Sequence, residues 1–174
     1  DLAGELATPS GMGAAPFAGR STSSDRPKAT ASAAAAPLKY QTPEGWVRGQ
    51  KEISRGGITV TRAAAFEVRD GDQRLEITVT SLPASAMLAN INRWRGQIGL
   101  EAITLEDFTQ SKKAIDFAGS PADYVEFSGA KETILGVIAQ RAATAWFVKL
   151  QGPVDLAKRE TKHFEEFVGS IRLE

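Results

Sequence analysis

The sequence contains no cysteine, and this absence excludes disulfides, thiolate metal ligands and cysteine nucleophiles together. Lysine plus arginine and aspartate plus glutamate each total 21, so the formal net charge is zero. A neutral chain has no overall field that would attract nucleic acid or an anionic membrane. We therefore expect no nucleic-acid partner.

Long hydrophobic runs are also lacking, because no stretch approaches the ~18 apolar residues of a transmembrane helix. The longest apolar stretches are residues 134–139 and 142–148, and both are interrupted. The numbering begins at Asp1 rather than at a methionine, so we expect that a signal or lipoprotein peptide could have preceded it. Membrane association is expected only through such an N-terminal anchor.

Recognisable catalytic motifs are missing as well. The sequence has no Gly-x-Ser-x-Gly elbow, no P-loop and no dinucleotide glycine pattern. His163 is the only histidine, and solvation is the favoured interpretation because a general base needs a positioned partner. Residues 70–72 lack the other ligands of a calcium loop and are interpreted as a hairpin turn, and residues 165–166 as a solvated helix face. We predict no enzymatic activity, no cofactor and no metal site.

Composition divides the chain into two parts. Residues 1–37 are rich in alanine, serine, glycine, proline and threonine and show no apolar periodicity. Such a segment cannot bury enough surface to offset its ordering entropy. We interpret it as a disordered tether, with a tail that has no function as the alternative. Residues 38–174 are predicted to form a single globular domain.

Alternating apolar residues predict a β-hairpin early in this domain. Residues 58–66 and 75–79 both have period 2, and the turn signal at residues 70–72 separates them. The odd-numbered residues of the second strand would face the core and the even-numbered residues would face water. Before the hairpin, a turn with proline and glycine should place Trp46 at the margin of the core.

An amphipathic helix is predicted between Pro83, which suits a first helical turn, and Gly99, which suits a left-handed C-cap. One face of this helix is apolar at helical spacing and should lie on the sheet. Its members are Ala84, Met87, Leu88, Ile91, Trp94 and Ile98. A short connecting segment that carries Leu105 and Phe108 follows the helix.

Four further strands are predicted at 112–117, 123–127, 133–139 and 144–150, at the spacing of a meander. The last two have consecutive apolar residues, so both of their faces should be covered. A C-terminal amphipathic helix begins after Gly152-Pro153. These elements predict an α/β fold of the α+β type: an antiparallel sheet of about six strands with helices on both faces, a three-layer α/β/α sandwich.

Three segments carry a resemblance to a known group. They read Asn-Arg-Trp-Arg-Gly-Gln-Ile-Gly-Leu at 92–100, Ala-Trp-Phe-Val-Lys-Leu-Gln-Gly-Pro at 145–153 and Phe-Glu-Glu-Phe-Val-Gly-Ser-Ile-Arg at 164–172. With the order of the predicted elements, residues 38–173 resemble the PsbP/Mog-like group, and within it uncharacterised bacterial exported proteins. The resemblance implies an α/β/α sandwich and a periplasmic or lipoprotein-like setting. Named members bind a photosystem or a Ran-type GTPase and share no catalytic residue set, so no site is carried over.

The sequence Arg93-Trp94-Arg95 is the strongest candidate for recognition, because it could hold an anion, a carboxylate or a stacked base. In the alternative interpretation Trp94 belongs to the core and both arginines pair with nearby acids while their stems cover apolar surface. Asn90, Arg93 and Gln97 share a polar face, and Arg95 borders the apolar face. We take these four residues as the candidate partner-binding site. Lys149 would join them if it points from the same side of the sheet.

These observations predict an exported, non-enzymatic α/β domain, tethered in the periplasm or cell envelope, that binds a protein or another cell-envelope partner. The alternative is a small-molecule carrier or enzyme with a pocket between sheet and helix, lined by Trp46, Trp94 and Trp146. This alternative requires a sizeable concave cavity with convergent polar groups. A structural or assembly module with constitutive partners is a third possibility.

Overall fold

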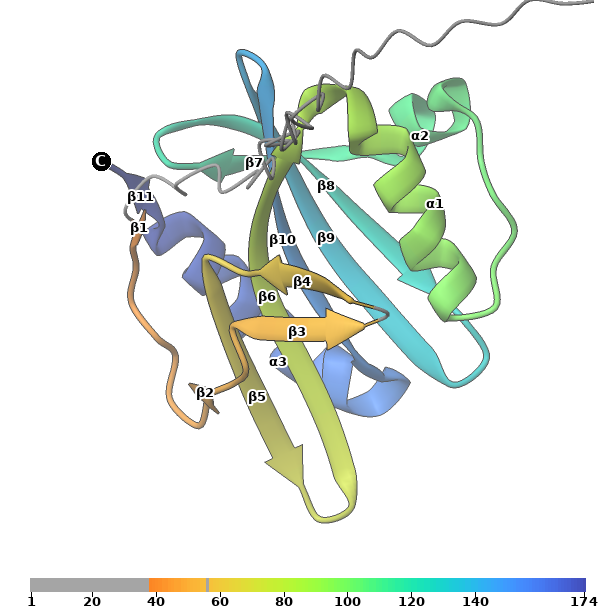
Figure 1. Ribbon diagram of the computed structural model, residues 1–174. Coiled ribbons are helices and arrows are strands. Elements are labelled where there is room, and N and C mark those ends of the chain that lie inside the picture. The colour runs from red at the N-terminus through yellow and green to blue at the C-terminus, as the bar shows by residue number, and fades with distance from the viewer. Residues whose placement is uncertain (1–37, 56) are drawn as a thin grey trace, which may run out of the picture. The chain divides into compact units, whose positions relative to one another are not determined.

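An antiparallel seven-stranded sheet forms the centre of the computed structural model, which describes residues 38–55 and 57–174 (Figure 1). The predicted tether, residues 1–37, lies outside the described residues. Across the sheet the strands are β2 (Val47–Arg48), β5 (Ala64–Asp70), β6 (Gln73–Pro83), β10 (Thr144–Pro153), β9 (Glu132–Arg141), β8 (Ser120–Ser128) and β7 (Lys113–Phe117). Two small sheets pair β3 (Glu52–Arg55) with β4 (Ile58–Thr61), and β1 (Leu38–Lys39) with β11 (Arg172–Leu173).

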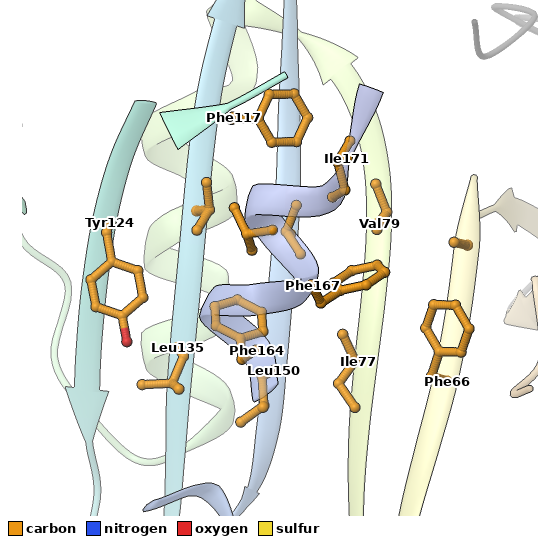
Figure 2. Close-up of a cluster of buried hydrophobic side chains, with 14 of the residues drawn as sticks. Phe66, Ile77, Val79, Phe117, Tyr124, Leu135, Leu150, Phe164, Phe167 and Ile171 are labelled. Atoms are coloured by element: carbon orange, nitrogen blue, oxygen red, sulfur yellow. The ribbon is translucent and has the colours of Figure 1, made fainter. Parts of the chain in front are cut away.

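Helices cover both faces of the large sheet. The 3-10 turn η1 (Ala84–Ala86) leads into α1 (Met87–Gln97), which is followed by α2 (Leu105–Ser111). Both α1 and α2 contribute to an apolar cluster with β8, β9 and β10 that includes Ile91, Trp94 and Phe108. On the opposite face, α3 (Val154–Ser170) inserts Phe164 and Phe167 against the sheet (Figure 2). The predicted three-layer α/β/α class is confirmed.

The predicted strand at residues 58–66 is wrong as a single element, because it forms β4 and part of β5, whereas the seven strands of the described sheet agree with the predicted number of about six. The backbone N–H of Arg62 donates to the carbonyl of Lys51, beside the small β3–β4 sheet, at 2.8 Å. The next N–H, of Ala63, donates to the carbonyl of Val79 in β6 at 2.8 Å. The chain therefore changes from one sheet to the other between adjacent residues.

The connecting segment after α1 contains a helix that the sequence interpretation missed. Thr104 caps α2: its hydroxyl accepts a hydrogen bond from the N–H of Asp107, and the Asp107 carboxylate accepts one from the N–H of Thr104. This reciprocal capping box satisfies two backbone donors that a helix start leaves free. Phe108 then lies on the apolar face of this short helix, where it is 2% exposed.

The α1 helix packs closely onto the sheet because β9 has a glycine beneath it. A Cβ atom at Gly136 would lie 2.6 Å from Cζ3 of Trp94, so no larger residue fits without movement of the indole. Trp94 also contacts the ring of Phe147 edge to face, with 5.6 Å between ring centroids. The helix ends as predicted at Gly99, whose φ is +79°, and the N–H of Leu100 donates to the carbonyl of Arg95 at 2.9 Å.

Trp46 is buried at the core margin, as predicted, and is 7% exposed. Its indole N–H donates to Oε2 of Glu160 at 3.1 Å, and Nδ1 of His163 lies 2.8 Å from the same oxygen. His163 is therefore held by a carboxylate rather than simply solvated. Residues 70–72 form the hairpin turn between β5 and β6, and Glu165 and Glu166 are exposed, both as predicted. No helix among the described residues has the length and apolar content needed to cross a bilayer.

Candidate functional site

Three of the four candidate residues lie along one side of α1 and meet the sheet through Lys149. Asn90 is 5% exposed and its side-chain oxygen accepts a hydrogen bond from Nη2 of Arg93. One turn further along, Oε1 of Gln97 accepts a hydrogen bond from Nζ of Lys149 at 2.7 Å. Lys149 therefore points from the same side of the sheet. We call Asn90, Arg93 and Gln97 the α1 row.

Arg95 lies apart from this row. Its Nε donates to the backbone carbonyl of Glu101 at 2.7 Å, and its guanidinium carbon lies 4.9 Å from the centre of the Phe127 ring. Arg95 thus fastens the loop after α1 to the sheet. The alternative interpretation is half right: Trp94 belongs to the core, with 3% of its surface exposed, but the side-chain hydrogen bonds of Arg93 and Arg95 go to neutral oxygens rather than to acids.

The register of the central strands builds a polar surface beside the α1 row. In the β6–β10 pair, Lys149 lies opposite Thr78 and Gln151 lies opposite Glu76. These side chains project to the face that α1 occupies, because the intervening residues Ile77, Val79, Val148 and Leu150 belong to the cluster beneath α3. We call Arg74, Glu76, Thr78, Lys149 and Gln151 the polar strip. A depression of about 260 Å³ lined by Arg74, Glu76, Glu132 and Gln151 lies along it.

The prediction that the even-numbered residues of β6 face water holds only in part, because neighbouring side chains cover some of this face. Thr78 is only 8% exposed. Arg62, in the link between β4 and β5, reaches Glu76 at 3.3 Å and also donates to the carbonyl of Gln50. Figure 1 correspondingly draws the β3–β4 hairpin in front of β6, on the side of α1. This face is thus partly covered, and Glu76 is paired with Arg62.

The carboxylates at the far end of the polar strip form ion pairs with arginines. Arg74 pairs with Glu67 and lies 3.6 Å from Glu76, while Arg69 lies 3.3 Å from Glu67. Glu132, beside the strip on β9, accepts a hydrogen bond from Nε2 of Gln151 at 3.1 Å. The acids of this surface therefore have partners within it.

Lys149 is the charged group that this environment affects most. Burial lowers its pKa to about 8; Glu76 and Glu132 oppose the change, and Arg93 and Arg62 add to it. The ammonium also lies 5.7 Å from the centre of the Trp94 ring. Lys149 and Arg93 thus form a pair of cations whose side-chain hydrogen-bond acceptors are the neutral amides of Gln97 and Asn90. Such a pair can bind an anion.

The predicted pocket lined by three tryptophans is wrong in its lining. Trp94 belongs to the apolar cluster beneath α1, whereas Trp46 and Trp146 belong to the cluster beneath α3, on the other face of the sheet. Two depressions in the described part of the chain, of about 260 and 360 Å³, are lined by other residues. The larger is lined by Ser111, Lys113, Tyr124, Glu126 and Ser128.

No protein-family model and no curated protein matches the sequence. Solved structures that match include a Bacteroides thetaiotaomicron protein, at 13% identity and TM-score 0.40, over 79% of this chain but 45% of that one. LpqN of Mycobacterium tuberculosis, involved in cell envelope biogenesis, matches at 11% identity and TM-score 0.45, over 78% of this chain and 82% of LpqN. Cyanobacterial PsbP from Synechocystis sp. PCC 6803 matches at 13% identity and TM-score 0.43, over 80% and 94%.

The group that the sequence resembles is thus represented among these structures by a PsbP protein. The matched part spans less than half of the Bacteroides protein. Identities of 11–13% and TM-scores below 0.5 indicate neither a partner nor an activity for this chain.

Proposed function

We propose that this chain is a non-enzymatic, extracytoplasmic domain that binds a protein or another cell-envelope partner through the α1 row and the polar strip. The observation that supports this proposal most directly is the 2.7 Å hydrogen bond between Lys149 and Gln97. It joins polar groups of two elements that are distant in sequence into one surface. The extracytoplasmic setting is supported by the resemblance of the sequence to exported bacterial proteins.

The packing of α1 onto the sheet holds the proposed binding residues in place. Ile91 and Trp94 anchor α1, since they are 0% and 3% exposed, while Arg93 and Gln97 of the same helix are exposed. A binding residue on a helix that is fixed by packing loses little conformational freedom when a partner binds. The two exposed residues of the α1 row, Arg93 and Gln97, therefore lie on a pre-organised helix rather than on a mobile loop, and the buried Asn90 holds Arg93 from below.

Photo-crosslinking from matched positions tests the proposal. Gly96 and Gly169 are exposed helical glycines with open space where a side chain would begin, and they lie in α1 and α3 respectively. A photoreactive amino acid at Gly96, in the full-length protein expressed in its own cells, should form a discrete adduct with one envelope component. The same amino acid at Gly169 should not form it. Identical adducts at both positions, or none at Gly96, would contradict the proposal.

A further inference from the structure

Two cations of the candidate surface, Lys149 and Arg93, differ from the neighbouring arginines in their hydrogen-bond partners. Arg62, Arg69 and Arg74 form ion pairs with Glu67 or Glu76. In contrast, Lys149 and Arg93 donate to amide oxygens, and within the described ranges they form no ion pair. They also lie close enough for the charge of Arg93 to lower the pKa of Lys149. The positive charge of this pair is therefore not neutralised by a direct acidic neighbour.

We infer that Lys149 and Arg93 form a carboxylate-binding site for an acidic side chain of a protein partner. This inference rests on the proposed function and specifies the chemistry of its partner. Hydrogen-bonding capacity is available, because an ammonium has three donors and only one is used on Gln97. The amide nitrogen of Gln97 is a further donor beside it, since the amide oxygen accepts from Lys149. A guanidinium adds the planar fork that suits a carboxylate.

The surrounding charges favour a single carboxylate over a polyanionic surface. Glu76 and Glu132 both act on Lys149, so negative charge already stands on two sides of the site. A dianionic phosphate or an anionic membrane would bring further negative charge against these acids and against Glu67. One acidic side chain, in a peptide whose other charges are mixed, meets the cation pair without this repulsion. We therefore assign the site to a peptide segment of a protein.

The protonation of Lys149 gives the site a pH dependence. Its pKa of about 8 reflects burial, with Arg93 on α1 and Arg62 before β5 opposing protonation, and Glu76 on β6 and Glu132 on β9 favouring it. A carboxylate binds the protonated form more tightly. With such a pKa the protonated fraction falls about tenfold between pH 7 and pH 9. Affinity for an acidic peptide should fall by up to about tenfold over this range.

Selection of peptides on the folded chain tests the inference. Random peptides displayed on phage are panned on the full chain, and the enriched peptides are measured by fluorescence anisotropy at pH 7 and at pH 9. We expect enrichment of aspartate and glutamate, loss of binding when these are changed to the amides, and weaker binding at pH 9. Lys149→Met and Arg93→Gln should each weaken binding by tenfold or more, and Lys149→Met should remove the pH dependence.

Controls separate this inference from folding and from other anions. Lys162→Met removes a cation from α3, where Lys162 is exposed, and should leave binding unchanged. Circular dichroism confirms that each variant is folded. Failure to enrich acidic peptides, unchanged affinity in both Lys149→Met and Arg93→Gln, or equal binding of inorganic phosphate or phosphatidylglycerol vesicles would overturn the inference. In those cases a discrete crosslink at Gly96 would still support the proposed function. Absence of that crosslink would contradict both the proposed function and the carboxylate-binding site.

Discussion

Replacing Lys149 with methionine should stabilise the folded chain at neutral pH. In the folded state burial lowers the pKa of Lys149 from 10.5 to about 8, which corresponds to about 3 kcal/mol between its charged and neutral forms. Methionine removes the charge and keeps an unbranched side chain, but it gives up the hydrogen bond from the ammonium to Gln97, worth about 1.5–3 kcal/mol because the donor is charged. The free energy of unfolding at pH 7 should therefore rise by up to about 1.5 kcal/mol.

The same substitution should change how stability depends on pH. Unfolded Lys149 keeps its proton up to a pKa near 10.5, but the folded form releases it near pH 8. Because the unfolded state binds more protons between these values, this group makes the natural chain more stable as pH rises from about 8 to about 10.5. The variant lacks that contribution, so its advantage should be largest at or below pH 8 and should shrink toward pH 10.

Urea denaturation of both proteins at pH 7 and pH 10 measures this difference. Lys162→Met, at an exposed position of α3, is the matched control and should change stability by less than about 0.5 kcal/mol. The reasoning is refuted if Lys149→Met is less stable than the natural chain at pH 7, or if the difference between them is the same at both pH values. Loss of peptide binding together with a gain in stability would mean that Lys149 is retained for recognition.

Two further substitutions test the support of the site. Gly136→Ala places a Cβ 2.6 Å from the Trp94 indole, so it should lower the free energy of unfolding by about 1–3 kcal/mol and shift the tryptophan fluorescence. Gly96→Ala is the control, because its Cβ enters open space, and it should be neutral or slightly stabilising. Thr104→Ala should cost about 1 kcal/mol and speed amide exchange in α2, while Thr104→Ser, which keeps the capping oxygen, should lose much less; equal losses would argue against the capping box.

The parts of the fold that sequence could predict are those with local signals. Turn residues separate the strands of the β7–β10 meander, and the apolar spacing from Ile91 to Ile98 marks α1, so these elements were placed correctly. The change of sheet at Arg62 has no such signal, because residues 58–66 contain no glycine, proline, asparagine or aspartate that would mark a turn. The short helix at 105–111 was missed although Thr104 and Asp107 have the spacing of a capping box. A helix of this length has too few turns to show periodicity.

For the candidate site, sequence could predict the α1 row but not the polar strip opposite it. Helical spacing puts Asn90, Arg93 and Gln97 on one side whatever they pack against. That Lys149 meets Gln97 depends on the β6–β10 register, which pairs strands far apart in the chain. The position of Arg95 depends on the loop after α1, because its acceptor is the backbone oxygen of Glu101. Every residue has a backbone carbonyl, so residue types alone cannot show which carbonyl accepts a hydrogen bond from Arg95.

The pairing of β6 with β10 also bears on how the protein folds. The β5–β6 hairpin and the β7–β10 meander each join strands that follow one another, whereas the β6–β10 pair must wait until the intervening chain, including α1 and α2, has closed into a large loop. Thr78 and Lys149 lie opposite each other in this β6–β10 pair, which forms late in folding. Either half of the sheet would therefore lack the complete polar strip, which a nascent chain should form only when its two halves have joined.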